Sequence, residues 1–252
     1  MPPVTLAIAR PEHRGLLRSA LLGLLAVALA VLAVALIAAS RLELSAGFIP
    51  KSLLVFGAGA LLVLRGLPAH HPFPTLGPAN GVTLVRGALV ALLAGLIGER
   101  APGAPTFAVA IAVAVIVLDG VDGWLARWTR MASRFGARFD METDAVLVAV
   151  LALLAWQFGK VGAWVLLSGL MRYLLLAAGA LVPLLRRPVP SSYRGKTIAV
   201  VQILALIVAI APISSVELAT AVAAIALGLL TGSFLLDVVW LVQHSDSGGG
   251  DR

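Results

Sequence analysis

The sequence of 252 residues has no cysteine, little charge and few aromatic residues. The absence of cysteine excludes disulfide bonds and thiol chemistry. Only 12% of the residues are charged, whereas 60% are hydrophobic and the mean hydropathy is +1.03. About a quarter of the residues of a soluble domain are charged, so this composition indicates a polytopic membrane protein built from α-helices.

The few charges are mostly positive, with a formal net charge of +7. In a soluble protein this excess would suggest a nucleic-acid partner. In a membrane protein, lysine and arginine residues in loops set the topology and meet anionic lipid headgroups. We therefore expect contact with membrane lipid and no nucleic-acid partner.

Apolar runs divide the sequence into eight expected membrane spans. The first, residues 19–39, exceeds the apolar core of a usual signal peptide, so we expect a retained helix. The second lies within residues 46–67. A proline- and glycine-rich joint, residues 66–78, follows, and we interpret its His70 and His71 as interfacial loop residues rather than as a metal site. Six further spans are expected at residues 81–97, 106–124, 145–158, 161–185, 197–213 and 218–242.

The expected fold class is all-α, a polytopic membrane bundle with a six-helix core and two additional N-terminal transmembrane helices. We divide the chain into an N-terminal segment (residues 1–78), the six-helix core (79–243) and a disordered tail (244–252). With the N-terminus inside, thirteen of the nineteen lysine and arginine residues fall on inside segments and four on outside segments. This bias favours both termini in the cytoplasm.

Four acidic residues interrupt the apolar sequence near the middle of the chain: Asp119, Asp122, Asp140 and Asp144. Spacings of three and four residues place each pair on one face of a helix. Four carboxylates at the edge of a bilayer repel one another and are costly to desolvate. Divalent cations relieve both problems, and carboxylate oxygens suit Mg²⁺ or Mn²⁺. The pattern predicts a two-metal site, which the topology places at the cytoplasmic face.

Small residues and one arginine accompany the first aspartate pair. Gly120 and Gly123 permit a bulky ligand to approach the backbone, and the guanidinium of Arg127 is suited to hold a phosphate. Carboxylates, metals and an arginine together indicate a phosphoryl or pyrophosphate site. The alternative for an isolated Asp-x-x-Asp is a helix cap or a solvated face, which does not easily account for four aspartates beside an intramembrane run.

The complete pattern Asp119-x2-Asp122-Gly123-x2-Ala126-Arg127-x8-Gly136-x3-Asp140-x3-Asp144 resembles the signature of the CDP-alcohol phosphotransferases at every fixed position. The resemblance covers about residues 78–242 and implies that the six later spans form the catalytic core of that family. Members transfer a substituted phosphate from a CDP-linked donor, commonly CDP-diacylglycerol, to an alcohol and release CMP. We therefore expect a phospholipid-synthesising membrane transferase that moves a phosphatidyl group to a small polar alcohol.

The resemblance implies a role for each signature residue. Asp119, Asp122 and Asp140 would ligate two divalent cations that clamp the donor pyrophosphate. Asp144 would join the metal site and act as the general base on the acceptor hydroxyl. The metals would neutralise the charge that builds up on the pyrophosphate. The implied donor-binding residues are Gly123, Ala126, Arg127 and Gly136, together with Asn80 and Thr83.

Further positive residues are candidates for binding the acceptor. Asn80-x2-Thr83-x2-Arg86 resembles the polar stripe that opens the first core helix of the family, and its spacing keeps the three side chains on one face. Residues 194–202 resemble a segment of phosphatidylglycerophosphate synthases but differ at Ile198 and Ala199, which argues against glycerol 3-phosphate. The acceptor-binding candidates are Arg86, Arg172, Arg194 and Lys196, the last two being equally well interpreted as residues of a positive-inside loop.

Two other classes of protein compete with a transferase. Intramembrane carboxylates also mark ion pathways, so the alternative is a divalent-cation or proton-coupled transporter, and a third interpretation is a catalytically idle scaffold. We expect an integral protein of the bacterial inner (cytoplasmic) membrane with its active site facing the cytoplasm. A homodimer is one assembly that the resemblance implies. The sequence leaves the acceptor open among glycerol 3-phosphate, inositol phosphate, inositol, serine, choline and another phospholipid.

Overall fold

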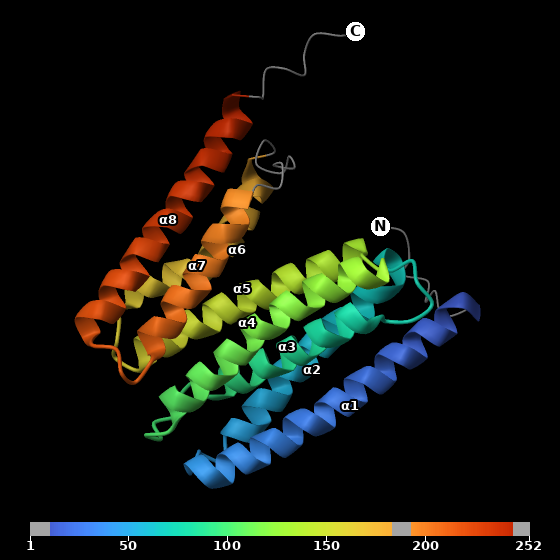
Figure 1. Cartoon of the computed structure of the whole chain (residues 1–252), viewed down its shortest axis with the longest axis horizontal. Coiled ribbons are helices and arrows are strands. Elements are labelled where there is room, and N and C mark those ends of the chain that lie inside the picture. The colour runs from blue at the N-terminus through green and yellow to red at the C-terminus, as the bar shows by residue number, and fades with distance from the viewer. Residues whose placement is uncertain (1–10, 183–192, 244–252) are drawn as a thin grey trace. The chain divides into compact units, whose positions relative to one another are not determined.

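The computed structural model describes residues 11–182 and 193–243. Within these residues the chain forms α-helices and one short 3₁₀ turn and no strand, so the expected all-α class is confirmed (Figure 1). The expected tail, residues 244–252, lies outside the described residues. The elements are α1 (Pro11–Leu42), α2 (Phe48–His70), α3 (Pro78–Gly95), α4 (Ala104–Thr129), α5 (Arg134–Gln157), η1 (Ala163–Val165), α6 (Leu166–Leu181), α7 (Tyr193–Ile210) and α8 (Val216–Gln243).

Six of the described helices are long and apolar enough to cross a membrane. Two of them, in α1 and α2, are the additional N-terminal helices that the sequence predicts. The other two described helices, α5 and α7, begin with charged turns. The protein is therefore an integral membrane protein. The six segments are Gly15–Leu42, Phe48–Leu67, Pro78–Gly95, Ala104–Thr129, Ala163–Leu181 and Val216–Gln243.

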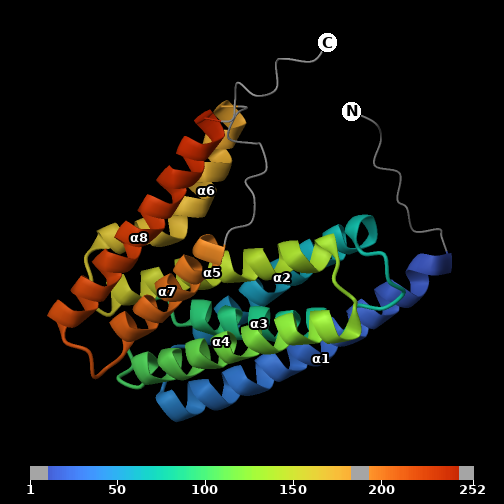
Figure 2. The same cartoon turned by 45° about the horizontal axis from the view of Figure 1, so that its top comes forward.

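The chain forms two compact units, residues 1–144 and 145–252, and the boundary falls within α5. In the first unit, α3 is the central helix, because α1, α2 and α4 all pack against it (Figures 1 and 2). Its sequence is apolar almost all round, and side chains such as Leu92 and Leu93 are fully buried. A polar side chain on this helix must find its partners inside the unit.

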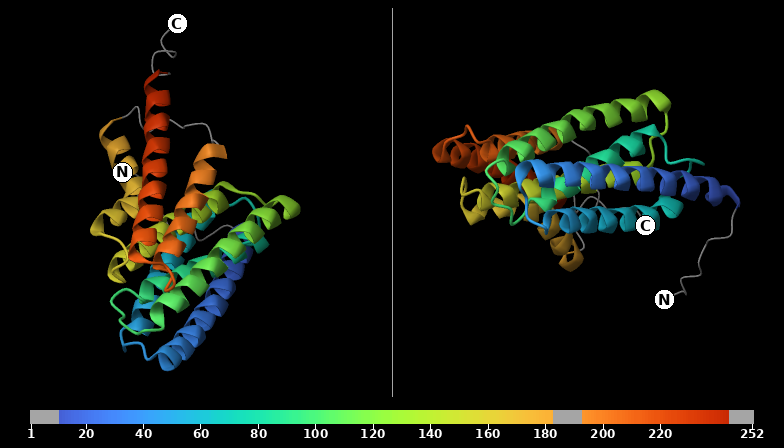
Figure 3. Two further views of the ribbon diagram at one scale, coloured as in Figure 1. Left: turned by 60° about the vertical axis from the view of Figure 1, so that its left-hand side comes forward. Right: turned by 90° about the horizontal axis from the view of Figure 1, so that it is seen from below.

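The outer helix α1 shows why the first unit suits a lipid environment. Its buried residues Leu16, Ala20 and Leu24 recur at a spacing of four and face the other helices. The intervening Leu21 and Leu25 are more than half exposed. In water such a face would aggregate, whereas a bilayer solvates it. Figure 3 shows α1 and α2 lying side by side.

Short loops give the first unit its antiparallel order. The α4 helix ends at Arg130, which adopts the left-handed conformation common at helix C-termini, with φ of 54°. The next helix begins at Arg134, after Ser133 has capped it by accepting a hydrogen bond from the backbone N–H of Gly136 at 3.0 Å. A loop this short makes α4 and α5 antiparallel neighbours.

The second unit is built around the packing of α7 against α8 (Figures 1 and 3). Small buried residues on α8, such as Ala219 and Ala223, lie in the same core as Leu206 of α7. A buried hydrogen bond of 3.0 Å from the Gln202 amide to Ser168 Oγ links α7 to α6. The Lys160 ammonium also donates to a backbone carbonyl of the α7–α8 loop.

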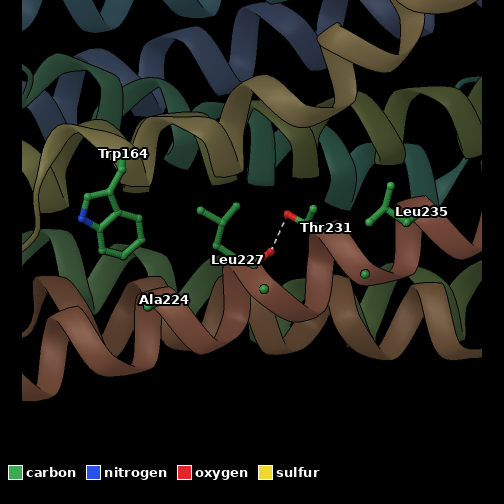
Figure 4. A pocket seen from close by; sticks show the side chains of 7 residues that line it. Trp164, Ala224, Leu227, Thr231 and Leu235 are labelled. Atoms are coloured by element: carbon green, nitrogen blue, oxygen red, sulfur yellow. Dashed lines mark hydrogen bonds between the residues drawn. The ribbon is translucent and has the colours of Figure 1, made fainter.

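An open apolar groove of about 490 Å³ runs along α8 in this unit (Figure 4). The hydroxyl of Thr231 donates to the Leu227 carbonyl of its own helix at 2.8 Å. The groove therefore offers apolar contact but no acid, base or cation. Its lining residues are Trp164, Ala224, Leu227, Gly228, Thr231, Gly232 and Leu235.

Candidate active site

The α4–α5 hairpin brings the two aspartate pairs together. Asp122 lies seven residues before the end of α4, and Asp140 lies six residues after the start of α5. At a rise of 1.5 Å per residue, both are about 10 Å from the connecting loop. Asp119 and Asp144 lie one further turn along each helix. The predicted convergence of the four carboxylates is thus a consequence of helix spacing and a short loop.

The side chain of Arg86 lies at the centre of the four carboxylates. Its Nη1 is 2.6 Å from Asp122 Oδ2 and 2.5 Å from Asp140 Oδ1. Its Nη2 is 2.7 Å from Asp119 Oδ1 and 2.5 Å from Asp144 Oδ1. Arg86 is only 1% exposed, so a single buried guanidinium joins side chains of α3, α4 and α5.

The charges of this cluster do not balance. Four carboxyl groups face one guanidinium, so the cluster carries three surplus negative charges when all four are ionised. Asp122 is almost buried, with 7% of its side chain exposed, whereas the side chains of the other three aspartates are 34–42% exposed. The cluster is therefore anchored internally through Asp122 and open to ligands on its outer side.

The donor set fits a divalent cation. Asp119, Asp140 and Asp144 can each present one carboxylate oxygen, and these atoms lie within 4.8 Å of one another. Oxygen-only ligands and excess negative charge suit Mg²⁺ or Mn²⁺. Asp122, which the sequence also predicts as a ligand, bonds to Arg86 and lies 3.0 Å from the hydroxyl of Thr83.

The predicted polar stripe of α3 lies on the buried side that faces this cluster. Thr83 Oγ1 can donate to Asp122 or to the Ala79 carbonyl at 3.1 Å. The Asn80 amide donates to the Leu76 carbonyl at 2.7 Å. A Cβ added at Gly136 would lie 2.7 Å from Asn80 Oδ1, which is closer than real contacts allow. Glycine at this position therefore lets the first turn of α5 approach α3.

The α4 surface beside the aspartates has little side-chain cover. Among the described residues, a Cβ at Gly120 would meet nothing within 4 Å. A Cβ at Gly123 would meet only Arg127 Nη1, at 3.5 Å. Ala126 adds a single methyl group, and Arg127 is exposed. This exposed backbone lies next to the carboxylates and to the exposed guanidinium of Arg127, and it leaves room for a large anionic ligand.

Sequence reasoning missed two features near this site. Trp124 and Trp128 stack on the exposed side of α4 with ring centroids 5.4 Å apart, a pairing that their spacing of four residues could have indicated. His71 lies in the loop after α2, as predicted, but the sequence did not indicate that its ring is only 6% exposed with both nitrogens hydrogen-bonded. His70 belongs to the last turn of α2 and is exposed.

The predicted acceptor residues fall into two groups. Arg86 contacts the four aspartates in the first unit. The others belong to the second unit, where Arg194 forms an ion pair of 2.5 Å with Asp237. Lys196 is exposed in the first turn of α7, and Arg172 is half-buried on α6.

Comparison with known proteins identifies the family. The model of the CDP-alcohol phosphatidyltransferase family matches residues 77–232, which is more than half of the chain. The protein belongs to this family. The predicted resemblance is confirmed, and the match includes the four aspartates and Arg86 but neither α1 nor α2. The search of curated proteins and the search of solved structures each give no match.

Membership defines the general chemistry of this CDP-alcohol phosphatidyltransferase. It is a transferase of the class that moves a phosphatidyl group from a CDP-alcohol, and the family uses divalent cations. The aspartate cluster is an acidic group that can hold such a cation. The family assignment does not favour the transporter alternative.

Proposed function

We propose that the protein transfers the phosphatidyl group of CDP-diacylglycerol to a small polar alcohol and releases CMP. The observation that supports this most is the unbalanced cluster of four carboxylates around Arg86, within a chain of the CDP-alcohol phosphatidyltransferase family. A balanced cluster would need no further ligand. Surplus negative charge at a partly exposed site favours the binding of cations.

The residues of the cluster take different roles in this proposal. Asp119, Asp140 and Asp144, together with Asp122, would hold two divalent cations, and Asp122 also anchors Arg86. Arg86 bonds to all four carboxylates and holds them close together before substrate arrives. When bound, Mg²⁺ or Mn²⁺ neutralises charge on the donor pyrophosphate and makes CMP a better leaving group.

The donor nucleotide binds along the bare face of α4. Gly123 and Ala126 leave the space for it, and Arg127 pairs with a donor phosphate. We place the predicted residues Asn80, Thr83 and Gly136 beneath this pocket. Asn80 and Gly136 set the approach of α5 to α3, and Thr83 orients the Asp122 carboxylate.

Asp144 acts as the general base. Its Oδ1 is bonded to Arg86, so we assign Oδ2 to accept the proton of the acceptor hydroxyl. The acceptor oxygen forms a bond to the phosphorus of the phosphatidyl group. The pyrophosphate bond to CMP breaks, and CMP leaves with the electron pair of that bond.

The acceptor is a small polar alcohol held by positive residues. We retain Arg172, Arg194 and Lys196 as candidates for binding it, and Arg194 would have to leave Asp237 to do so. The distribution of lysine and arginine supports an active site that faces the cytoplasm. We further propose location in a bacterial inner membrane and assembly as a homodimer.

The test is release of CMP by the purified protein. The protein in lipid nanodiscs is given CDP-diacylglycerol, Mg²⁺ or Mn²⁺, and a panel of alcohols. We expect metal-dependent CMP release with at least one acceptor, and lipid mass spectrometry identifies the product. If no acceptor gives release while another family member is active in the same assay, the proposal is wrong.

A further inference from the structure

A chain of hydrogen bonds joins the end of α2 to the start of α5. His71 Nδ1 is 3.1 Å from Ser133 Oγ, and His71 Nε2 is 2.8 Å from the Thr75 carbonyl oxygen. Ser133 Oγ is also 3.0 Å from the backbone nitrogen of Gly136. His71 lies before the family match, which begins at residue 77, whereas Ser133 lies inside it. These hydrogen bonds therefore connect the N-terminal hairpin of α1 and α2 to the part of the protein that the family match covers.

The direction of each hydrogen bond follows from its partners. A carbonyl oxygen only accepts, so His71 Nε2 carries the hydrogen and donates to Thr75. In the neutral imidazole His71 Nδ1 then accepts from the Ser133 hydroxyl, whose oxygen accepts from the Gly136 N–H. Ser133 is the N-cap of α5, and such a cap is worth about 1 kcal/mol. His71 thus orients the side chain that caps α5.

Aromatic packing reinforces the same connection. The His71 ring makes edge contacts with Phe73 and Phe135, with centroids 5.4 and 5.9 Å apart. Phe135, in the first turn of α5, is 7% exposed. A Cβ at Gly66 of α2 would lie 3.4 Å from the Phe135 ring. The first turn of α5 is therefore held against the last turns of α2 by both polar and apolar contacts.

This first turn determines where two of the four carboxylates lie. Asp140 is seven residues beyond Ser133, about 10 Å along the same helix. A helix transmits a rotation at its first turn to the next turns, because its backbone is rigid. A displacement of 1 Å at a catalytic site can cost about 10²-fold in rate. Small changes at His71 should therefore reach Asp140 and Asp144.

We propose that His71 is a positioning residue: through Ser133, it makes the N-terminal hairpin fix the edge of the metal site that α5 contributes. This proposal rests on the proposed function only in treating Asp140 and Asp144 as metal ligands. It assigns a task to α1 and α2, which the family match does not cover. In this role the hairpin completes the site rather than only adding membrane-embedded surface.

The first experiment measures Mn²⁺ binding to the purified protein by electron paramagnetic resonance, without substrate. We expect His71→Ala and Ser133→Ala to raise the half-saturating Mn²⁺ concentration about tenfold, because loss of groups that orient metal ligands weakens metal binding by about that factor or more. The double variant should bind Mn²⁺ as tightly as the weaker-binding of the two single variants, because both substitutions break the same His71–Ser133 hydrogen bond. His70→Ala is the matched control, since His70 is exposed, and it should bind Mn²⁺ like the parent.

The second experiment separates positioning from general stability. His71→Gln keeps a hydrogen-bond donor and an acceptor, so it should restore most of the Mn²⁺ affinity. It also replaces His71→Ala in these measurements if His71→Ala does not fold. Hydrogen exchange of residues 134–144 should be faster in Ser133→Ala and close to the parent in His71→Gln. Unchanged Mn²⁺ affinity and unchanged exchange in folded His71 and Ser133 variants would overturn the proposal.

The outcomes also distinguish this proposal from the proposed function. Weaker Mn²⁺ binding in the variants of a protein that never releases CMP would support the positioning role and refute the transferase. CMP release together with identical Mn²⁺ binding in all variants would support the transferase and refute the positioning role. A parent protein that binds no Mn²⁺ would overturn the positioning role as stated.

Discussion

The two ends of the first unit each contain ion pairs, but their charges are arranged differently. At the end with the α1–α2 and α3–α4 loops, Lys51 Nζ lies 2.8 Å from Glu99 Oε1, one cation with one anion. The backbone N–H and hydroxyl of Ser45 also donate to Glu99, at 2.8 and 2.6 Å. At the other cluster, one cation faces four anions.

This difference separates a structural ion pair from a binding site. The Glu99 side chain is 3% exposed, and the Lys51 ammonium further donates to the Ile97 carbonyl at 2.6 Å. These contacts join two loops and balance each other's charge. The aspartate cluster has surplus negative charge and partly exposed carboxylates, so a bound cation would relieve the repulsion among them. Within the first unit, charge imbalance therefore distinguishes the candidate active site better than polarity does.

The largest expected effect follows from removing the positive charge of Arg86 from the aspartate cluster. Arg86→Leu leaves Asp122 buried without its ion-pair partner and three more carboxylates repelling one another. Loss of one partner of a buried ion pair costs about 3–5 kcal/mol. We expect a large fall in thermal stability and no CMP release. The unfolding temperature in nanodiscs and the CMP assay measure the two effects.

Lys51→Ala is the matched change at the balanced cluster. Lys51 is 37% exposed, and Glu99 retains two hydrogen bonds from Ser45. We expect a loss of about 1 kcal/mol and CMP release close to that of the parent. Equal destabilisation by Lys51→Ala and Arg86→Leu would contradict the distinction between the two clusters.

The next largest effect is on turnover, when one carboxylate in each cluster is replaced by the corresponding uncharged amide. Asp144→Asn removes the proposed base, and general-base catalysis contributes about 10²- to 10⁴-fold in rate. We expect turnover to fall by that factor while CDP-diacylglycerol still binds, as measured by equilibrium binding of labelled nucleotide. Glu99→Gln, an equally small change, should leave turnover intact. Retained turnover in Asp144→Asn would refute the assigned base.

Much of the fold and part of the site could be predicted from the sequence, because both depend on local spacing. Apolar runs predicted the helices, and the three- and four-residue steps predicted that each aspartate pair shares a helix face. The expected spans end at residue 124 and resume at residue 145, whereas α4 continues to Thr129 and α5 begins at Arg134, so the tightness of this hairpin is known only from the structure. The structure brings these carboxylates together for the reasons that the spacing gives.

The rest depends on long-range contacts that spacing does not encode. Arg86 is unusual as a charge inside a span, but which carboxylates it contacts depends on how α3 packs against α4 and α5. His71 and Ser133 are sixty-two residues apart, and neither stands out in its own segment. Lys51 and Glu99 are likewise paired by the packing of the first turn of α2 against the α3–α4 loop. Contacts of this kind become visible only in three dimensions.

A smaller effect tests how the negatively charged cluster accepts a negatively charged donor. The donor pyrophosphate needs a cation outside the four carboxylates, and Arg127 is exposed beside Gly123. A charge-assisted hydrogen bond contributes about 1.5–3 kcal/mol, so Arg127→Ala should raise the donor KM about tenfold or more. Arg134→Ala, at an exposed arginine on a variable position of the signature, is the control. An unchanged donor KM in Arg127→Ala would show that the donor lies elsewhere.

The smallest effect is the pH dependence of the balanced cluster. Burial acts to raise the pKa of Glu99, but hydrogen bonds from Lys51 and Ser45 outweigh it and hold that pKa below its ordinary value. A carboxyl with a lowered pKa in the folded state stabilises the protein fully above its unfolded pKa, about 4.3. This contribution is lost as the pH falls through the lower, folded value. The unfolding temperature of the parent should therefore exceed that of Glu99→Gln at neutral pH, and the gap should close below about pH 4.3. A gap that stays constant down to pH 3 would show that Glu99 stabilises the loops by its shape and not by its charge.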